Sequence, residues 1–136
     1  MTSPVLALRR AILDAASTDA DLRSLMGGSL RLYDEPPRGA EPVYALFGDV
    51  KAEDWSTDLD RGHAQSVDLV IWSENGGART ALMVADRFFA ILDDASLPLQ
   101  GHRLVNLRVT ELVSARDKDS GLTRVTLSLR AVTEVV

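Results

Sequence analysis

Residues 63–72, with the sequence His-Ala-Gln-Ser-Val-Asp-Leu-Val-Ile-Trp, decide the fold class of this chain. Val67, Leu69 and Ile71 recur at every second position, which predicts a β-strand with one buried face. Val70 and Trp72 place apolar side chains on the opposite face. A strand that is apolar on both faces is usually covered on both sides. The second cover is then either the core of the same chain or another subunit.

The segment after this strand predicts the longest helix of the chain, over about residues 77–94. Its apolar side chains recur at helical spacing and form one stripe, made of Ala78, Ala81, Leu82, Ala85, Phe88, Phe89 and Leu92 and widened by Val84 and Ile91. We expect this stripe to cover the sheet, with Leu82, Phe89 and Leu92 packed on Leu69, Ile71, Val109 and Leu127.

Two further strands close the chain as a hairpin. The alternation of residues 105–109 is interrupted by Glu111, which predicts a β-bulge near residues 110–112. Residues 117–121 have the composition of a turn, and residues 125–131 alternate again. The pattern predicts an antiparallel pair.

The N-terminal part is expected to form two helices. The first follows Ser3, a capping residue, and carries Leu6 on its apolar stripe. Arg9 falls inside that stripe, so it either reaches a carboxylate or a partner chain along the core edge, or extends to water. Ser17 or Thr18 is expected to cap the second, short helix.

Two short strands, at residues 30–33 and 43–47, are predicted on either side of the proline-rich residues 34–39. Residues 49–62 are polar, and the ends of any extended structure there are not predicted. The expected fold is α+β, a mostly antiparallel sheet of about four to five strands with two N-terminal helices and one long helix packed on it. We expect a single domain over residues 1–136.

Composition excludes several classes of protein. The chain has 136 residues, of which 46% are hydrophobic, and a net charge of −5. Its apolar runs are too short to span a bilayer and no secretory signal is expected, so we predict no membrane contact. This net negative charge argues against non-specific binding of nucleic acid, because the phosphates of nucleic acid are also negative. The chain has no cysteine, which removes disulfides, thiolate zinc sites and thiol nucleophiles.

Motifs that carry chemistry are nearly absent from the sequence. His63 and His102 have no second ligand at metal-binding spacing. Gly76–Gly77 lack the lysine and hydroxyl of a phosphate-binding loop, and they are expected to begin a helix. Four acidic residues lack the spacing of a calcium loop and predict either a solvated loop or a partner-facing surface: Glu53, Asp54, Asp58 and Asp60. We expect no catalytic residue, no cofactor and no metal.

The order and spacing of several short motifs resemble the phage tail-completion family, which includes tail terminators of long-tailed phages and of gene transfer agents. These motifs are Asp54-Trp-Ser-Thr57, Gly62-His63, Val67-Asp-Leu-Val-Ile-Trp-Ser73, Gly77 and the helix at residues 85–92. The opening helices and the strand after the proline-rich loop match the layout of that family. The resemblance covers about residues 3–134.

The resemblance implies a structural virion protein rather than an enzyme. Members form a hexameric ring that caps the tail tube, stops its polymerisation and joins it to the head-side neck. The implied partners are other copies of the chain, the tail tube protein and a neck or connector protein, with DNA passing through the lumen without specific binding. The implied place is the tail of a virion or phage-like particle assembled in the bacterial cytoplasm.

Two alternatives stay open. One is a neck or head-closure protein. The other is a small enzyme with an unrecognised site, which a cleft with buried and mutually coupled carboxylates would favour.

A ring of identical subunits needs a heterologous interface, in which two different surfaces of each copy meet. We expect it to use strand edges, the polar residues 49–62 and the second face of the strand at residues 63–72. The predicted interface residues are Glu53, Asp54, Trp55, Asp58, Asp60 and Trp72. The two tryptophans are the candidate anchors, because buried aromatic side chains dominate the energetics of interfaces. Residues 49–62 are also a candidate for part of the contact with the tube.

Overall fold

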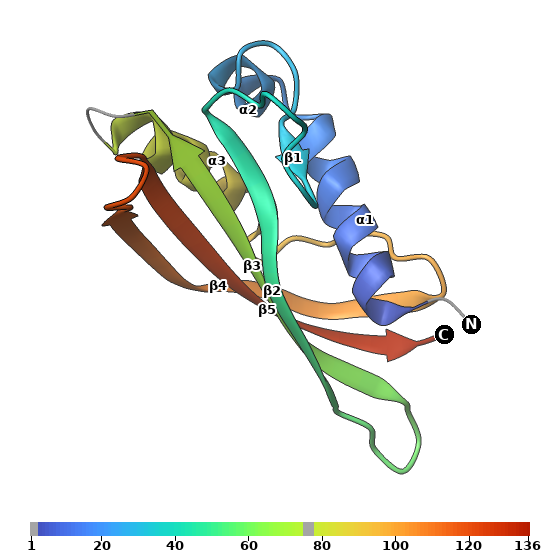
Figure 1. Ribbon diagram of the computed structural model, residues 1–136. Helices are drawn as coiled ribbons and strands as arrows, with labels where there is room; N and C mark the ends of the chain where they lie inside the picture. Colours follow the sequence, from blue (N-terminus) through green and yellow to red (C-terminus); the bar gives the residue numbers. More distant parts are fainter. Residues whose placement is uncertain (1–2, 75–77) are drawn as a thin grey trace.

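Three helices and five strands make up the part of the chain that the computed structural model describes, residues 3–74 and 78–136 (Figure 1). In chain order these are α1 (Pro4–Ser17), α2 (Ala20–Leu25), β1 (Leu32–Tyr33), β2 (Tyr44–Asp54), β3 (Gly62–Ser73), α3 (Arg79–Leu92), β4 (His102–Arg116) and β5 (Thr123–Val135). The strands form one sheet in the order β1-β2-β3-β5-β4. β1 pairs with β2 in parallel, and the other neighbours pair antiparallel. The predicted α+β fold with a mostly antiparallel sheet is confirmed.

Both N-terminal helices begin where a short polar side chain accepts a hydrogen bond from a free backbone amide. The Ser3 hydroxyl accepts from the amide of Leu6 at 3.3 Å, which confirms the predicted cap of α1. The cap of α2 is Asp19, so the prediction of Ser17 or Thr18 is wrong. The hydroxyls of those two residues instead donate back to carbonyl oxygens of α1, at 2.9 and 3.0 Å. They end the first helix rather than begin the second.

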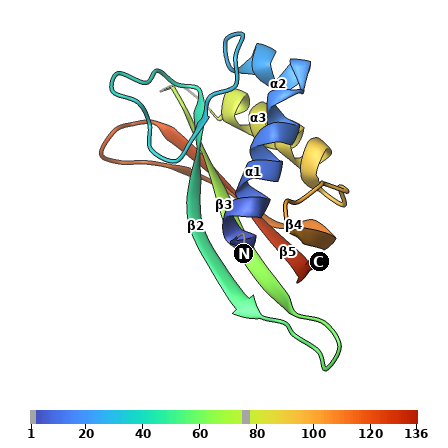
Figure 2. The same ribbon diagram turned by 90° about the vertical axis from the view of Figure 1, so that its right-hand side faces the viewer.

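The core lies between the helices and one face of the sheet (Figure 2). Alternate residues of the two central strands point into it, as predicted from their period of two. The buried side chains at the centre are Leu69 and Ile71 of β3, Val125, Leu127 and Leu129 of β5, and Phe88 and Leu92 of α3. Of the two phenylalanines predicted in the buried stripe, this packing buries Phe88 and leaves Phe89 partly exposed.

Two residues assigned to buried stripes face solvent. Phe89 is 44% exposed and Leu6 is 62% exposed, whereas Phe88 is fully buried. Successive residues of a helix point about 100° apart, so Phe88 and Phe89 cannot both face the sheet. The prediction that Phe89 packs on the sheet is therefore wrong. The predicted start of this helix, at residue 77, lies outside the described residues.

β2 extends well beyond the predicted strand at residues 43–47. Its register with β3 shifts between Phe47 and Val50, and the pairing then continues to Asp54. A Cβ atom added to Gly48 would lie 3.0 Å from Cγ2 of Val70, so glycine allows the close approach of the two strands at this bulge. The polar residues that follow are extended because β3 pairs with them.

β4 is irregular at two positions. Its register with β5 shifts between Val109 and Glu111, which confirms the predicted bulge. A second shift, between Leu104 and Asn106, was not predicted. It turns Val105 outward, where its side chain is 48% exposed, while Leu107 is buried.

Candidate interface

The face of the sheet opposite the three described helices is open. Its side chains alternate along each strand with those of the core, and we call it the open face (Figure 2). Leu46, Val70 and Thr126 lie side by side across it, one from each of three neighbouring strands. These three residues line a shallow groove together with Phe47, Gly48, Asp49, Asp68, Trp72 and Arg124. An open face with an apolar centre and charged surroundings has the composition of a protein contact.

Trp72 lies on the open face and is half-buried. Its neighbours across the sheet are Tyr44 on β2 and Arg124 on β5. The guanidinium of Arg124 lies 5.9 Å from the centre of the indole ring. The sequence left two positions open for Trp72, the core of its own subunit or a contact with another subunit. The structure excludes the core between the sheet and the helices.

Trp55 comes directly after Asp54, which pairs with His63 at the loop end of the hairpin formed by β2 and β3. Its amide donates to the carbonyl of Gly62 at 2.9 Å, and its side chain is 56% exposed. The guanidinium of Arg130 lies 5.3 Å from the ring centre. Since Arg130 pairs with Ser66 on the open face, Trp55 covers one end of that face. Residues 66–72 span roughly 20 Å of strand, so the two tryptophans lie far apart on a shared face.

The acidic residues of the predicted interface gather on the same hairpin. Asp54 accepts hydrogen bonds from the amide and hydroxyl of Ser56, at 3.2 and 2.5 Å, which lower the pKa of its carboxyl. Glu53 pairs with Lys51 at 2.7 Å, and this hydrogen bond lowers the pKa of Glu53. Both carboxyls therefore stay charged at neutral pH.

The loop between the two strands presents an apolar side chain between two carboxylates. Leu59 is 93% exposed, and Asp58 and Asp60 on either side are exposed as well. The Thr57 hydroxyl accepts from the amides of Leu59 and Asp60 at 3.4 and 3.0 Å, so the chain itself orders this turn. Sequence reasoning singled out the two carboxylates and missed the leucine.

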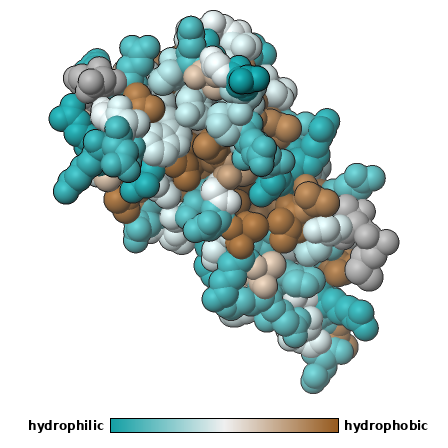
Figure 3. Space-filling view, in the orientation of Figure 1, coloured by the Kyte–Doolittle hydropathy of each residue, from teal (hydrophilic) through white to brown (hydrophobic). Residues whose placement is uncertain are grey.

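A second groove, on the helix side of the sheet, was not predicted. We call it the α1 groove; it is lined by Leu6, Arg9, Arg10, Leu13, Leu32, Asp34 and Phe47. Figure 3 shows hydrophobic surface gathered between α1 and β2. Arg9 pairs with Asp34, and its guanidinium lies 4.8 Å from the ring centre of Phe47. The prediction that Arg9 reaches a carboxylate along the edge of the core is confirmed.

Residues 3–74 and 78–136 contain no cluster of three or more His, Cys, Asp or Glu side chains that could hold a metal ion. The pKa values of Asp93 and Asp117 are lowered, mainly by hydrogen bonds to the carboxylates. A general acid needs the opposite shift. The predicted helix start at Gly76–Gly77 lies outside the described residues. Within the described residues, 3–74 and 78–136, no helix has the length and apolar character needed to cross a membrane.

Comparisons with known proteins match nearly the whole chain. The model of the family described as tail completion protein gp17 matches residues 10–134. The fold is similar to a chain in a structure entitled "Virion of native gene transfer agent (GTA) particle", with a TM-score of 0.88 and 26% identity, covering 98% of this chain and 99% of that chain. A second solved structure, with a TM-score of 0.50 and 18% identity over 99% of this chain and 97% of that chain, shows similarity of fold alone. No curated protein matches the sequence.

Proposed function

The chain belongs to the tail completion protein gp17 family, and we propose that it is the tail terminator of a phage-like particle. In this role a hexameric ring caps the tail tube, ends its polymerisation and offers a docking surface to the head-side neck. The observation that carries the proposal is the end-to-end similarity to a chain of a gene transfer agent virion, with a TM-score of 0.88. The chain then acts in the tail of a virion, after assembly in the bacterial cytoplasm.

The two surfaces of the molecule support a ring. A closed ring of identical copies needs two different patches on each copy. The open face and the α1 groove are different surfaces on opposite sides of the sheet. A terminator also needs one side that accepts the last ring of the tube and another that refuses a further one. A two-layer domain has such unlike sides, since one is made of strands and the other of helices.

The proposed contact surface consists of Glu53, Asp54, Trp55, Asp58, Asp60 and Trp72. It serves contacts with neighbouring copies and with the tail tube protein. The two edge strands of the sheet are poorer contacts, because β1 has only two residues and β4 contains two register shifts that interrupt a regular row of hydrogen-bonding groups. The proposal therefore relies on the open face and on the hairpin of β2 and β3.

The charge of the chain fits a channel for DNA. Its net charge of −5 gives little general attraction for phosphates. A lumen through which DNA slides should not hold the phosphates tightly. We propose that DNA passes through the ring without specific binding.

Deletion of the gene, with electron microscopy of the resulting particles, tests the proposal. We expect overlong tubes that carry no heads, and rescue by the gene supplied in trans. Native mass spectrometry of the purified protein, or of rings released from particles, should show a hexamer. Tails of normal length that lack heads would indicate a neck or head-closure role instead. Normal particles after deletion would exclude both roles.

A further inference from the structure

The α1 groove combines an apolar floor with a rim of two ion pairs, Arg9 with Asp34 and Arg10 with Asp14. Leu6 and Leu13 of α1 and Phe47 of β2 supply the apolar surface of this groove of about 240 Å³. Arg10 lies at the rim, with its guanidinium 3.2 Å from Asp14 and its side chain largely exposed. An exposed ion pair of this kind is weak, so Arg10 is available to a stronger acidic partner.

The loop between β2 and β3 has the complementary character. We call residues 58–60, Asp-Leu-Asp, the tip. Leu59 is almost fully exposed between two exposed carboxylates. Besides the hydroxyl of Thr57, a backbone hydrogen bond of 2.8 Å from the Thr57 amide to the Asp60 carbonyl closes the turn. A turn that is already ordered loses little conformational entropy on binding.

The tip cannot reach the groove of its own chain. Regular pairing from Val50↔Val67 to Asp54↔His63 makes the hairpin a stiff arm. At the rise of a β-strand, residues 47–54 extend roughly 20 Å from the Phe47 wall of the groove towards the tip. Figures 1 and 2 show the arm projecting past the end of α1. Any tip that fills the groove must come from another molecule.

We propose that the tip of one copy docks in the α1 groove of a second copy, with Leu59 against Leu6 and the flanking carboxylates facing Arg10. Apolar surface meets apolar surface, and the two carboxylates of the tip compete with Asp14 for the largely exposed guanidinium of Arg10. Because the tip and the groove are different surfaces, the contact is heterologous and repeats from copy to copy. The inference rests on the proposed ring and names the segments that join its subunits.

Disulfide trapping tests this contact directly, because the chain has no cysteine of its own. Leu59→Cys protein is mixed with Leu6→Cys protein under mild oxidation, and cross-linked dimers are measured on a non-reducing gel. Leu6 is exposed, so its replacement should leave the fold intact. The control partner is Asp119→Cys, in the exposed turn between β4 and β5. A disulfide needs Cα atoms within about 7 Å, so only a docked tip gives efficient cross-linking.

We expect a much higher yield for the tip and groove pair than for the tip and control pair. Equal yields would overturn the inference. Cross-linking of the tip to the tail tube protein in particles, without cross-linking to Leu6→Cys, would overturn it as well. A hexameric ring that forms without this cross-link would refute the tip contact and leave the proposed function intact. Normal particles after gene deletion would instead refute the proposed function.

Charge exchange gives a second test. One variant carries Arg10→Glu, and a second carries Asp58→Lys together with Asp60→Lys. Each variant should raise the dissociation constant between copies about tenfold or more, as measured by native mass spectrometry. Combining the two sets of changes should restore assembly. Asp119→Lys is the matched control and should change nothing. A combined variant that assembles no better than the single sets would overturn the proposed pairing of charges.

Discussion

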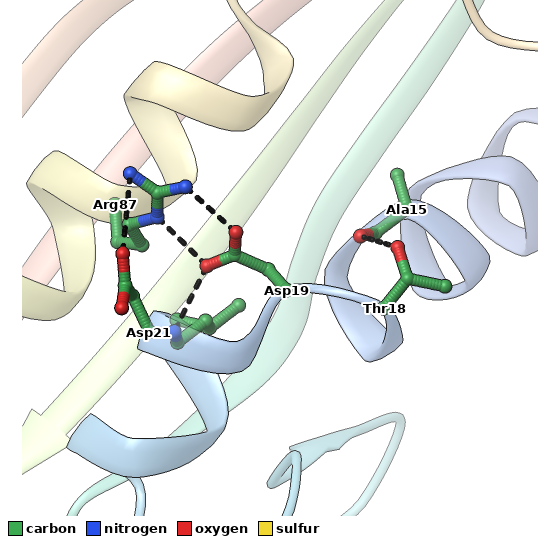
Figure 4. Close-up of polar contacts among 6 residues, drawn as sticks. Ala15, Thr18, Asp19, Asp21 and Arg87 are labelled. Carbon is green, nitrogen blue, oxygen red and sulfur yellow. Dashed lines mark hydrogen bonds and ion pairs between the residues drawn. The ribbon is translucent and has the colours of Figure 1, made fainter.

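Arg87 of α3 holds the carboxylate of Asp19 through two hydrogen bonds of 2.7 Å each, across 68 residues of sequence (Figure 4). The same carboxylate accepts a hydrogen bond from the amide of Leu22 at 2.9 Å and so caps α2. The hydrogen bonds from Arg87, with help from the Leu22 amide, lower the pKa of Asp19. One side chain therefore starts a helix and ties it to another.

The two roles of Asp19 can be separated by substitution. Asp19→Asn keeps a side-chain oxygen for the cap and loses the charge that Arg87 pairs with. Asp19→Ala loses both, and it should be about 1 kcal/mol less stable than the asparagine variant. Urea unfolding of the three proteins should rank them in the order wild type, asparagine, alanine. Equal stability of the two variants would mean that the cap contributes nothing.

The ion pair also predicts a dependence of stability on pH. The pKa of Asp19 in the folded protein lies below its ordinary value of 3.8. The charged carboxylate thus stabilises the fold above pH 3.8, and this contribution is lost as the pH falls through the lowered pKa. The difference in unfolding free energy between wild type and Asp19→Asn should be constant near neutral pH and shrink below pH 3.8. A difference that persists unchanged in acid would contradict the role of the charge.

The two adjacent phenylalanines of α3 offer a matched pair for the core. Phe88 is fully buried and Phe89 is 44% exposed. Phe88→Ala should cost about 3–5 kcal/mol in unfolding free energy, because it leaves a cavity in the core. Phe89→Ala should cost much less. Denaturant unfolding measures both, and similar costs would show that the helix is rotated from the orientation described above.

Trp55 tests whether assembly can be weakened without loss of the fold. Its side chain is 56% exposed, so Trp55→Ala should leave the melting temperature of the isolated subunit nearly unchanged. The same change should shift the protein from ring towards monomer in native mass spectrometry, because it removes an aromatic side chain that the ring contact would bury. Trp55→Phe should retain part of the assembly. An unfolded alanine variant would place Trp55 in the subunit core and exclude the interface role.

The carboxylates of the tip should matter in particles rather than in folding. Asp58→Lys with Asp60→Lys alters exposed charges, which usually change stability by less than about 0.5 kcal/mol. We expect particles made with this variant to show overlong tubes or tails without heads in electron microscopy. Asp119→Lys, in the turn between β4 and β5, should give normal particles. Tubes of normal length joined to heads in the double variant would exclude these carboxylates from the contacts of the terminator.

Elements with one-sided burial were predictable from the sequence alone. The strand at residues 63–72, the alternation of residues 125–131 and the capped first helix all appear as predicted. A side chain that must face the core repeats every two residues in a strand and every three or four in a helix. This period is local, so it can be detected without knowing what the element packs against.

Features that depend on the partner of a segment were decided by the tertiary structure. Residues 50–54 lie in a stretch that the sequence marks as largely polar, and they are strand because β3 supplies hydrogen bonds to their backbone. The choice of Phe88 over Phe89 follows from the angle at which α3 lies on the sheet. Neither a pairing partner nor a packing angle leaves a local period in the sequence.

The same distinction applies to the candidate interface. Sequence alone predicted the six interface residues and the family resemblance, and it placed five of the six in the polar residues 49–62. The structure places these five on the hairpin of β2 and β3 and its loop. Only the folded chain shows that Trp72 lies on the open face and that Leu6, Arg9 and Phe47 meet in a groove. Residues from α1 and β2 come together there because the helix packs across the sheet. A surface made by two distant segments depends on that packing, and no single stretch of sequence encodes it.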